Sequence, residues 1–129
     1  MNKIRIPLLI TSLILSLLLT ACSKDEPTPT KSREVKFEVT GTFSGTIDAT
    51  YITAGGGATN ETLPSLPWKK NISYQSSVSG TTITIAGGGG VAGQTLKVKV
   101  FAEGTVVSET PGVANSSGII VIAAPTYVF

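Results

Sequence analysis

The chain has 129 residues, with ten lysines and arginines against eight aspartates and glutamates, and a formal net charge of +2. It contains no histidine and a single cysteine, Cys22. These numbers exclude an intramolecular disulfide and the Cys/His clusters that hold zinc. They also leave Asp, Glu, Lys and Tyr as the residues for any acid–base catalysis.

An apolar segment opens the chain. Lys3 and Arg5 supply two positive charges, and a run rich in leucine and isoleucine follows as far as Leu19. A basic start, a short apolar core and small residues at its end are typical of a secretory signal peptide. Crossing a bilayer takes about 20 apolar residues, which disfavours the alternative of an uncleaved membrane helix. We therefore predict that residues 1–21 are a cleaved signal peptide.

The end of this segment, Leu19-Thr20-Ala21-Cys22, resembles a bacterial lipobox. The resemblance implies that Cys22 becomes the first residue of the mature protein and carries a diacylglycerol. One acyl chain binds a membrane only marginally, whereas two or more anchor a protein stably. The membrane is therefore a predicted partner, through the lipid on Cys22. The predicted location is the outer membrane, at its periplasmic face or at the cell surface.

Residues 22–34 are predicted to be the lipidated cysteine and a disordered tether. Their only apolar residues after Cys22 are two prolines, too little surface to offset the entropy lost on ordering. Lys24-Asp25-Glu26 resembles the short charged tag of surface-exposed lipoproteins in Bacteroidota, and an ordinary polar linker is an equal alternative. Cleavage would leave eight basic and eight acidic residues. The excess positive charge that would favour nucleic-acid binding then disappears, so we predict no nucleic-acid partner.

Residues 35–129 form one predicted domain, in which apolar and polar residues alternate. The expected strands lie at 34–40, 46–51, 68–74, 81–85, 96–103, 105–108 and 118–124. A tight turn over 42–45 joins the first two, and Glu103-Gly104 joins two others as a hairpin. The segment 118–124 is apolar on both parities, which predicts a strand covered on both faces. Seven or eight short strands at this spacing predict an all-β fold, an antiparallel immunoglobulin-like β-sandwich.

Trp68, Lys69 and Lys70 are the candidate contact site for a ligand or partner, because aromatic and cationic groups together suit glycan, lipid or protein surfaces. The favoured alternative places Trp68 in the core of the sandwich, with solvated lysines beside it. The glycine runs at 55–57 and 87–90 lack the following helix that a phosphate-binding loop needs, and they predict loops.

Catalysis would require Asp48, Glu61 or Glu109 to gather around a cleft. These carboxylates are instead scattered along polar strand faces, with no spacing that suggests a pair. The sequence also has no calcium-loop pattern. We therefore predict that the protein is not an enzyme and that it has no cofactor and no metal site.

Several motifs together resemble the MmpS-like family of small mycobacterial membrane proteins, over residues 35 to about 124. They are the segments 35–42, 51–53, 66–70, 98–107 and 116–118. The resemblance implies an extracytoplasmic β-sandwich and an accessory role beside RND-type exporters of lipids and siderophores, with no catalytic residues. This chain has a lipobox where the family has a transmembrane helix, and its domain lacks the cysteines of some relatives. The predicted function is a membrane-anchored, non-enzymatic accessory or adaptor module of an envelope transport or assembly system. The alternative is a glycan- or lipid-binding surface module.

Overall fold

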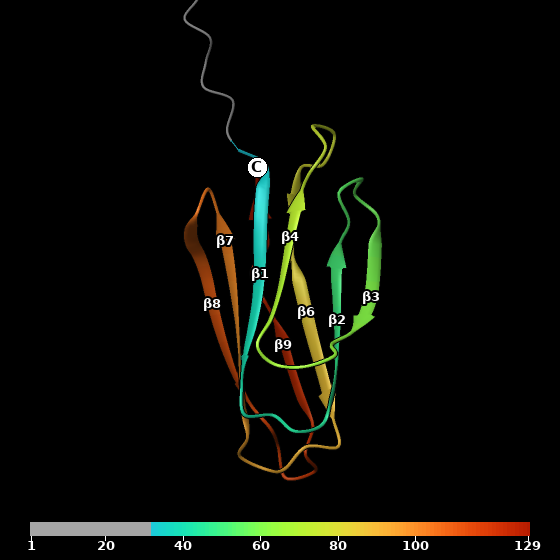
Figure 1. Ribbon diagram of the computed structural model, residues 1–129, viewed down its shortest axis with the longest axis vertical. Helices are drawn as coiled ribbons and strands as arrows, with labels where there is room; N and C mark the ends of the chain where they lie inside the picture. Colours follow the sequence, from blue (N-terminus) through green and yellow to red (C-terminus); the bar gives the residue numbers. More distant parts are fainter. Residues whose placement is uncertain (1–31) are drawn as a thin grey trace, which may run out of the picture. The chain divides into compact units, whose positions relative to one another are not determined.

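The alternating segments form the strands of an antiparallel β-sandwich. A computed structural model describes residues 32–129, which all belong to one structural unit and contain no helix (Figure 1). The strands in chain order are β1 (Glu34–Gly41), β2 (Thr46–Ile52), β3 (Ala58–Thr62), β4 (Trp68–Ser73), β5 (Gly80–Thr81), β6 (Ile83–Gly88), β7 (Thr95–Ala102), β8 (Thr105–Val113), β9 (Ile120–Ala123) and β10 (Tyr127–Val128).

Two four-stranded sheets make the sandwich, in the orders β4-β1-β7-β8 and β3-β2-β6-β9, and every neighbouring pair is antiparallel. The short strands β5 and β10 pair with each other in a separate two-stranded sheet. The predicted antiparallel sandwich is confirmed, and its two main sheets hold eight strands. Sequence patterning missed β3 because the weakly alternating Ala58–Thr62 has no fully buried residue.

The core lies between the sheets and is filled by every second residue of the inner strands. On β1 the buried side chains are Val35, Phe37 and Val39, the last two with no exposed surface. The Phe37 ring lies 6.0 Å from that of Tyr51 on β2, centroid to centroid. Because side chains alternate in direction along a strand, this inward row leaves the polar residues of β1 on the outer face.

The connection 42–45 differs from the tight turn that the sequence predicts between paired strands. β1 pairs with β4 and β7, whereas β2 pairs with β3 and β6, so this segment carries the chain from one sheet to the other. Phe43 within it is 5% exposed and closes the end of the core. Its ring lies against Gly87, where a Cβ would be 2.7 Å from Phe43 Cε1. The apolar residue in the middle of the segment therefore makes it a crossing between the sheets.

The expectation that 118–124 is covered on both faces is wrong. β9 is an edge strand that pairs with β6 alone. Ile120 and Ile122 are buried, but Ile119 and Val121 are 47% and 66% exposed. The outer face of an antiparallel sheet can lie in water, and here it does so with aliphatic side chains on it.

The predicted hairpin at Glu103-Gly104 is confirmed between β7 and β8. Both turn residues have positive φ, 53° for Glu103 and 75° for Gly104, as a two-residue hairpin turn of the primed type requires. This conformation costs glycine little and is uncommon for a glutamate.

Arg33 and Glu34, which the sequence assigns to the tether, are part of the folded domain. Glu34 is the first residue of β1 and pairs with Ser73. The Arg33 guanidinium donates hydrogen bonds to the carbonyls of Gln75 and Val78, and it lies 4.3 Å from the centroid of the Phe129 ring. The polar composition of the segment hides these contacts. The predicted signal peptide, the lipobox Leu19–Cys22 and the tether up to residue 31 lie outside the described residues.

Replacing Phe37 by alanine should destabilise the domain by about 3–5 kcal/mol, because the change removes a ring from the centre of the core. Val121→Ala is the matched control on an exposed position and should change stability by no more than about 0.5 kcal/mol. Urea unfolding followed by tryptophan fluorescence measures both. Similar losses for the two variants would contradict the burial described here.

Candidate functional site

The structure does not bring Trp68, Lys69 and Lys70 together on one surface. Trp68 is 7% exposed, and its ring lies 6.2 Å from that of Tyr51 in the core. Lys69 points to the outer face of the sheet, where its Nζ lies 3.6 Å from Glu38 Oε2. Lys70 occupies an inward-facing position on the edge strand β4, opposite Phe37 of β1. Trp68 is thus a core residue, the alternative that the sequence favours, and it offers no open ring to a ligand.

Lys70 belongs to a polar cluster with Tyr51 and Glu61, where β2, β3 and β4 meet. The Tyr51 hydroxyl donates to Glu61 Oε2 at 2.6 Å, and Lys70 Nζ lies 3.3 Å from the same oxygen. The hydrogen bond from Tyr51 holds the pKa of Glu61 below its ordinary value, and burial raises the pKa of Tyr51. Because Lys70 belongs to one sheet and Glu61 to the other, the cluster connects the two sheets.

The three carboxylates that an enzyme would need are not gathered. Asp48 accepts a hydrogen bond from Thr62 on the outer face of the β3-β2-β6-β9 sheet. Glu109 lies on the other sheet, where Lys97 Nζ is 2.8 Å from its Oε1. Within residues 32–129 there is also no group of three or more His, Cys, Asp or Glu side chains that could hold a metal ion.

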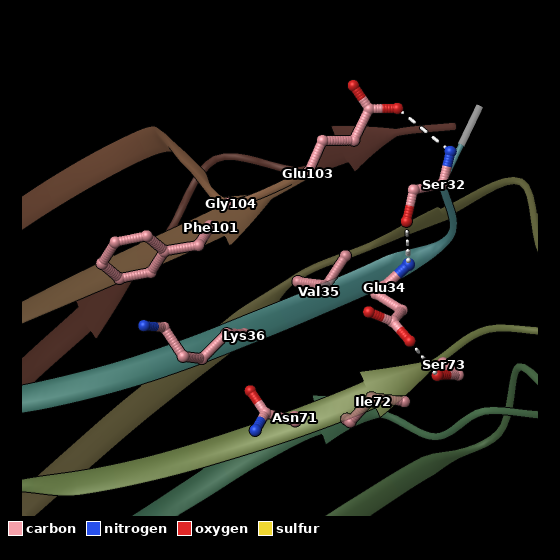
Figure 2. A pocket seen from close by; sticks show the side chains of 10 residues that line it. All are labelled: Ser32, Glu34, Val35, Lys36, Asn71, Ile72, Ser73, Phe101, Glu103 and Gly104. Atoms are coloured by element: carbon pink, nitrogen blue, oxygen red, sulfur yellow. Dashed lines mark hydrogen bonds between the residues drawn. The ribbon is translucent and has the colours of Figure 1, made fainter.

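A pocket of about 660 Å³ lies on the outer face of the β4-β1-β7-β8 sheet, at the end where Ser32 begins the described chain (Figure 2). We call it the outer-face pocket. Its walls come from three strands and the β7–β8 turn, and it is lined by Ser32, Glu34, Val35, Lys36, Asn71, Ile72, Ser73, Phe101, Glu103 and Gly104.

The strand register sets the middle of this pocket. Lys36 on β1 lies opposite Asn71 on β4 and opposite Phe101 on β7, so the three side chains form one row across the sheet. Lys36 Nζ is 3.9 Å from the centroid of the Phe101 ring. The side-chain amide of Asn71 forms no hydrogen bond to any residue that the structure describes. An aromatic ring, an ammonium group and a free amide thus lie side by side.

Two carboxylates stand at the end of the pocket near Ser32. Glu34 Oε1 accepts a hydrogen bond of 3.4 Å from the Ser73 hydroxyl, and Glu103 Oε1 accepts one of 3.0 Å from the Ser32 backbone amide (Figure 2). The sequence does not predict the pocket, because the residues that line it come from separate strands. The sequence feature that points to the pocket is Phe101, an aromatic residue at a position of β7 that alternates with the buried residues and so faces outward with the lysines.

The opposite end of the domain is formed by three connections, 42–45, 89–94 and 114–119, which lie together at the bottom of Figure 1. We call this region the loop end. Gln94 Oε1 accepts hydrogen bonds from the Ser44 amide and hydroxyl, both at 3.1 Å, and from the Val91 amide at 2.9 Å. Backbone bonds join the other loops, with Gly90 N to Gly118 O at 3.1 Å. The loops are therefore tied to one another.

The loop end also lacks charge. None of its three connections contains Asp, Glu, Lys or Arg, and neither does the segment 110–113 that leads into the third. Three aliphatic side chains are exposed on these connections or directly beside them: Val91 at 61%, Ile119 at 47%, and Val113, the last residue of β8, at 64%.

No protein-family model matches the chain, and no curated protein matches it in sequence. The resemblance to the MmpS-like family therefore stays a prediction. Among the residues that the structure describes, none forms a helix long and apolar enough to cross a membrane.

Glu61→Gln should lower the melting temperature at neutral pH by roughly 4–8 °C, as expected for a loss of about 1 kcal/mol when a charged hydrogen-bond acceptor is removed. The folded pKa of Glu61 lies below its ordinary value of 4.5. Its contribution is therefore complete above that value and is lost as the pH falls through the folded pKa. The difference in melting temperature between Glu61→Gln and wild type should therefore become smaller as the pH falls. Thermal unfolding measured at several acidic pH values would show this.

Glu109→Gln is the control, because Glu109 is an exposed partner of Lys97 and such pairs contribute little. If Glu109→Gln lowered the melting temperature as much as Glu61→Gln, the cluster would have no specific role in connecting the sheets.

Proposed function

We propose that the protein is a lipid-anchored extracytoplasmic accessory module, without enzymatic activity, that binds another envelope protein through its loop end. The observation that carries the proposal is the uncharged loop end with Val91, Val113 and Ile119 exposed on it. The cores of protein–protein interfaces are depleted of charged residues in the same way.

The hydrogen bonds within the loop end add to this argument. Binding is weakened by the entropy lost when mobile loops become ordered. Here Gln94 already joins Ser44 and Val91, and Asn115 Oδ1 accepts hydrogen bonds from the amides of Ser117 and Ile119 at 2.9 and 3.0 Å. The exposed aliphatic side chains therefore stand on loops whose conformation is already held.

The place of the loop end also suits an anchored module. The start of β1, which directly follows Ser32 and Arg33, and the loop end lie at opposite ends of the domain (Figure 1). A lipid on Cys22, as the lipobox resemblance implies, would hold the domain from the Ser32 side and leave the loop end available to a partner. The MmpS-like resemblance suggests an RND-type exporter complex as that partner, with the outer membrane as the location, at its periplasmic face or at the cell surface.

The loop-end prediction is tested by crosslinking in cells, followed by mass spectrometry of what the protein captures. Val91→Asp and Ile119→Asp should each reduce capture of an envelope protein by about tenfold or more, because each introduces a charge that the interface would have to desolvate. Val106→Asp is the matched control, an exposed valine 43% accessible near the other end of the domain, and should capture as wild type does. Capture of no envelope protein by the wild type, or equal capture by all variants, would overturn the proposal.

The anchor has its own test. Cys22→Ala should abolish incorporation of a labelled fatty acid and release or mislocalise the protein, since the thiol is the proposed site of attachment. Membrane fractionation with mass determination of the N-terminus measures both effects. Continued membrane association with an uncut N-terminus would mean that residues 1–21 act as a membrane helix.

A further inference from the structure

We propose that the outer-face pocket binds a neutral oligosaccharide, with a sugar ring against Phe101 and its hydroxyls bonded to Asn71, Glu34 and Glu103. The pocket is lined by residues at the start of β1 and at the β7–β8 turn, and these elements lie at the end of the domain opposite the loop end (Figure 1). The proposal does not depend on the proposed function.

Phe101 is the first reason for the proposal. The other described phenylalanines, Phe37, Phe43 and Phe129, are buried or packed against the core, whereas Phe101 is part of neither group. It stands on a polar sheet face, half-buried and level with Lys36 and Asn71 (Figure 2). A sugar ring has an apolar face of C–H groups, and an aromatic ring surrounded by polar groups is suited to cover it.

The lysine above the ring does not block such contact. Lys36 lies on Phe101 through a cation–π contact, which is weak at exposed sites. Its flexible side chain can move aside and donate a hydrogen bond to a hydroxyl of the ligand. Phe101 is therefore covered by a weak contact to Lys36, and its ring is not part of the core.

The polar side chains of the pocket can form hydrogen bonds with the hydroxyl groups of a sugar. The Asn71 amide has both a donor and an acceptor without a partner among residues 32–129. Glu34 and Glu103 each accept the bonds described above through Oε1, which leaves Oε2 of each carboxylate available. Sugar hydroxyls both donate and accept, so they match a mixed set of this kind. The volume of about 660 Å³ also falls within the range of about 300–1,000 Å³ that is usual for small-molecule sites.

The charges of the pocket select the class of sugar. Two carboxylates face a single ammonium group, Lys36, so the pocket is net negative. Like charges brought together disfavour binding. Uronic acids and the phosphates of lipid headgroups should therefore bind worse than neutral sugars.

The conformation of Glu103 agrees with a role at the rim of the pocket. Its φ of 53° lies where glycine, asparagine or aspartate is the usual residue of such a turn. Backbone strain of this kind recurs at ligand-binding sites. Glutamate at this turn places a carboxylate beside Ser32, within the pocket (Figure 2).

The test is an NMR titration of the full-length chain in detergent micelles with cellotetraose, mannotetraose and tetragalacturonate. We expect at least one neutral tetrasaccharide to shift the backbone amides of 34–36, 71–73 and 101–104 at millimolar concentration, and tetragalacturonate to bind more weakly. Phe101→Leu should weaken binding about tenfold, and Phe101→Trp should retain it. Asn71→Ala, a change at an exposed side chain, should weaken binding severalfold. Thr46→Ala, exposed on the other sheet, should bind as wild type does.

Several outcomes would overturn the proposal. They are no shifts with either neutral sugar, shifts confined to residues outside the pocket, unchanged affinity in Phe101→Leu and Asn71→Ala, or tighter binding of tetragalacturonate. Val91→Asp, which should disrupt the loop end, must leave sugar binding intact. The sugar titration therefore tests the outer-face pocket separately from the loop end, which the crosslinking experiment tests.

Discussion

The contact between aromatic rings across the two sheets is the interaction on which the domain most depends. Phe37 comes from one sheet and Tyr51 from the other, and Trp68 lies against Tyr51 from the strand beside Phe37. Disulfides stabilise many small domains, but this chain has one cysteine, outside the domain. The two sheets are held together by core packing and by the Tyr51–Glu61–Lys70 cluster beside it.

Once the inward positions are fixed by this core, alternation assigns every other residue to an outer face, and the two outer faces differ. Across the β4-β1-β7-β8 sheet, acidic and basic side chains alternate from strand to strand, with Lys69 opposite Glu38 and Lys99 opposite Glu109. On the other sheet, Thr50 lies between Asn60 and Thr84. Charge is therefore concentrated on one face, which also carries the outer-face pocket, while the loop end has none.

Much of the fold follows from local pattern. The period-two alternation locates the main strands, Glu103-Gly104 locates the hairpin, and the prediction of a sandwich core correctly buries Trp68. These features depend on short stretches of chain. The failures concern pairings between distant segments. Whether residues 42–45 form a turn or a crossing depends on which strands β1 and β2 pair with, and no local pattern specifies that.

The same limit applies to the sites. Asn71, Lys36 and Phe101 are neighbours only because β1 lies between β4 and β7, an arrangement set by the whole topology. The exposure of Val121 likewise depends on the two-layer arrangement, which leaves the outer face of the β3-β2-β6-β9 sheet in water at Ala86 of the central strand β6 as well as at Val121. Arg33 belongs to the domain because Phe129 and the carbonyls of Gln75 and Val78 lie around it.

The contact between Arg33 and Phe129 brings the two ends of the described chain to the same place. Domains with adjacent ends can be inserted into a surface loop of another protein, or circularly permuted, with little disturbance to their core. A short linker from Phe129 to Arg33 would close this domain into a continuous chain. It could then be reopened at the hairpin turn between β7 and β8, which would leave every strand whole.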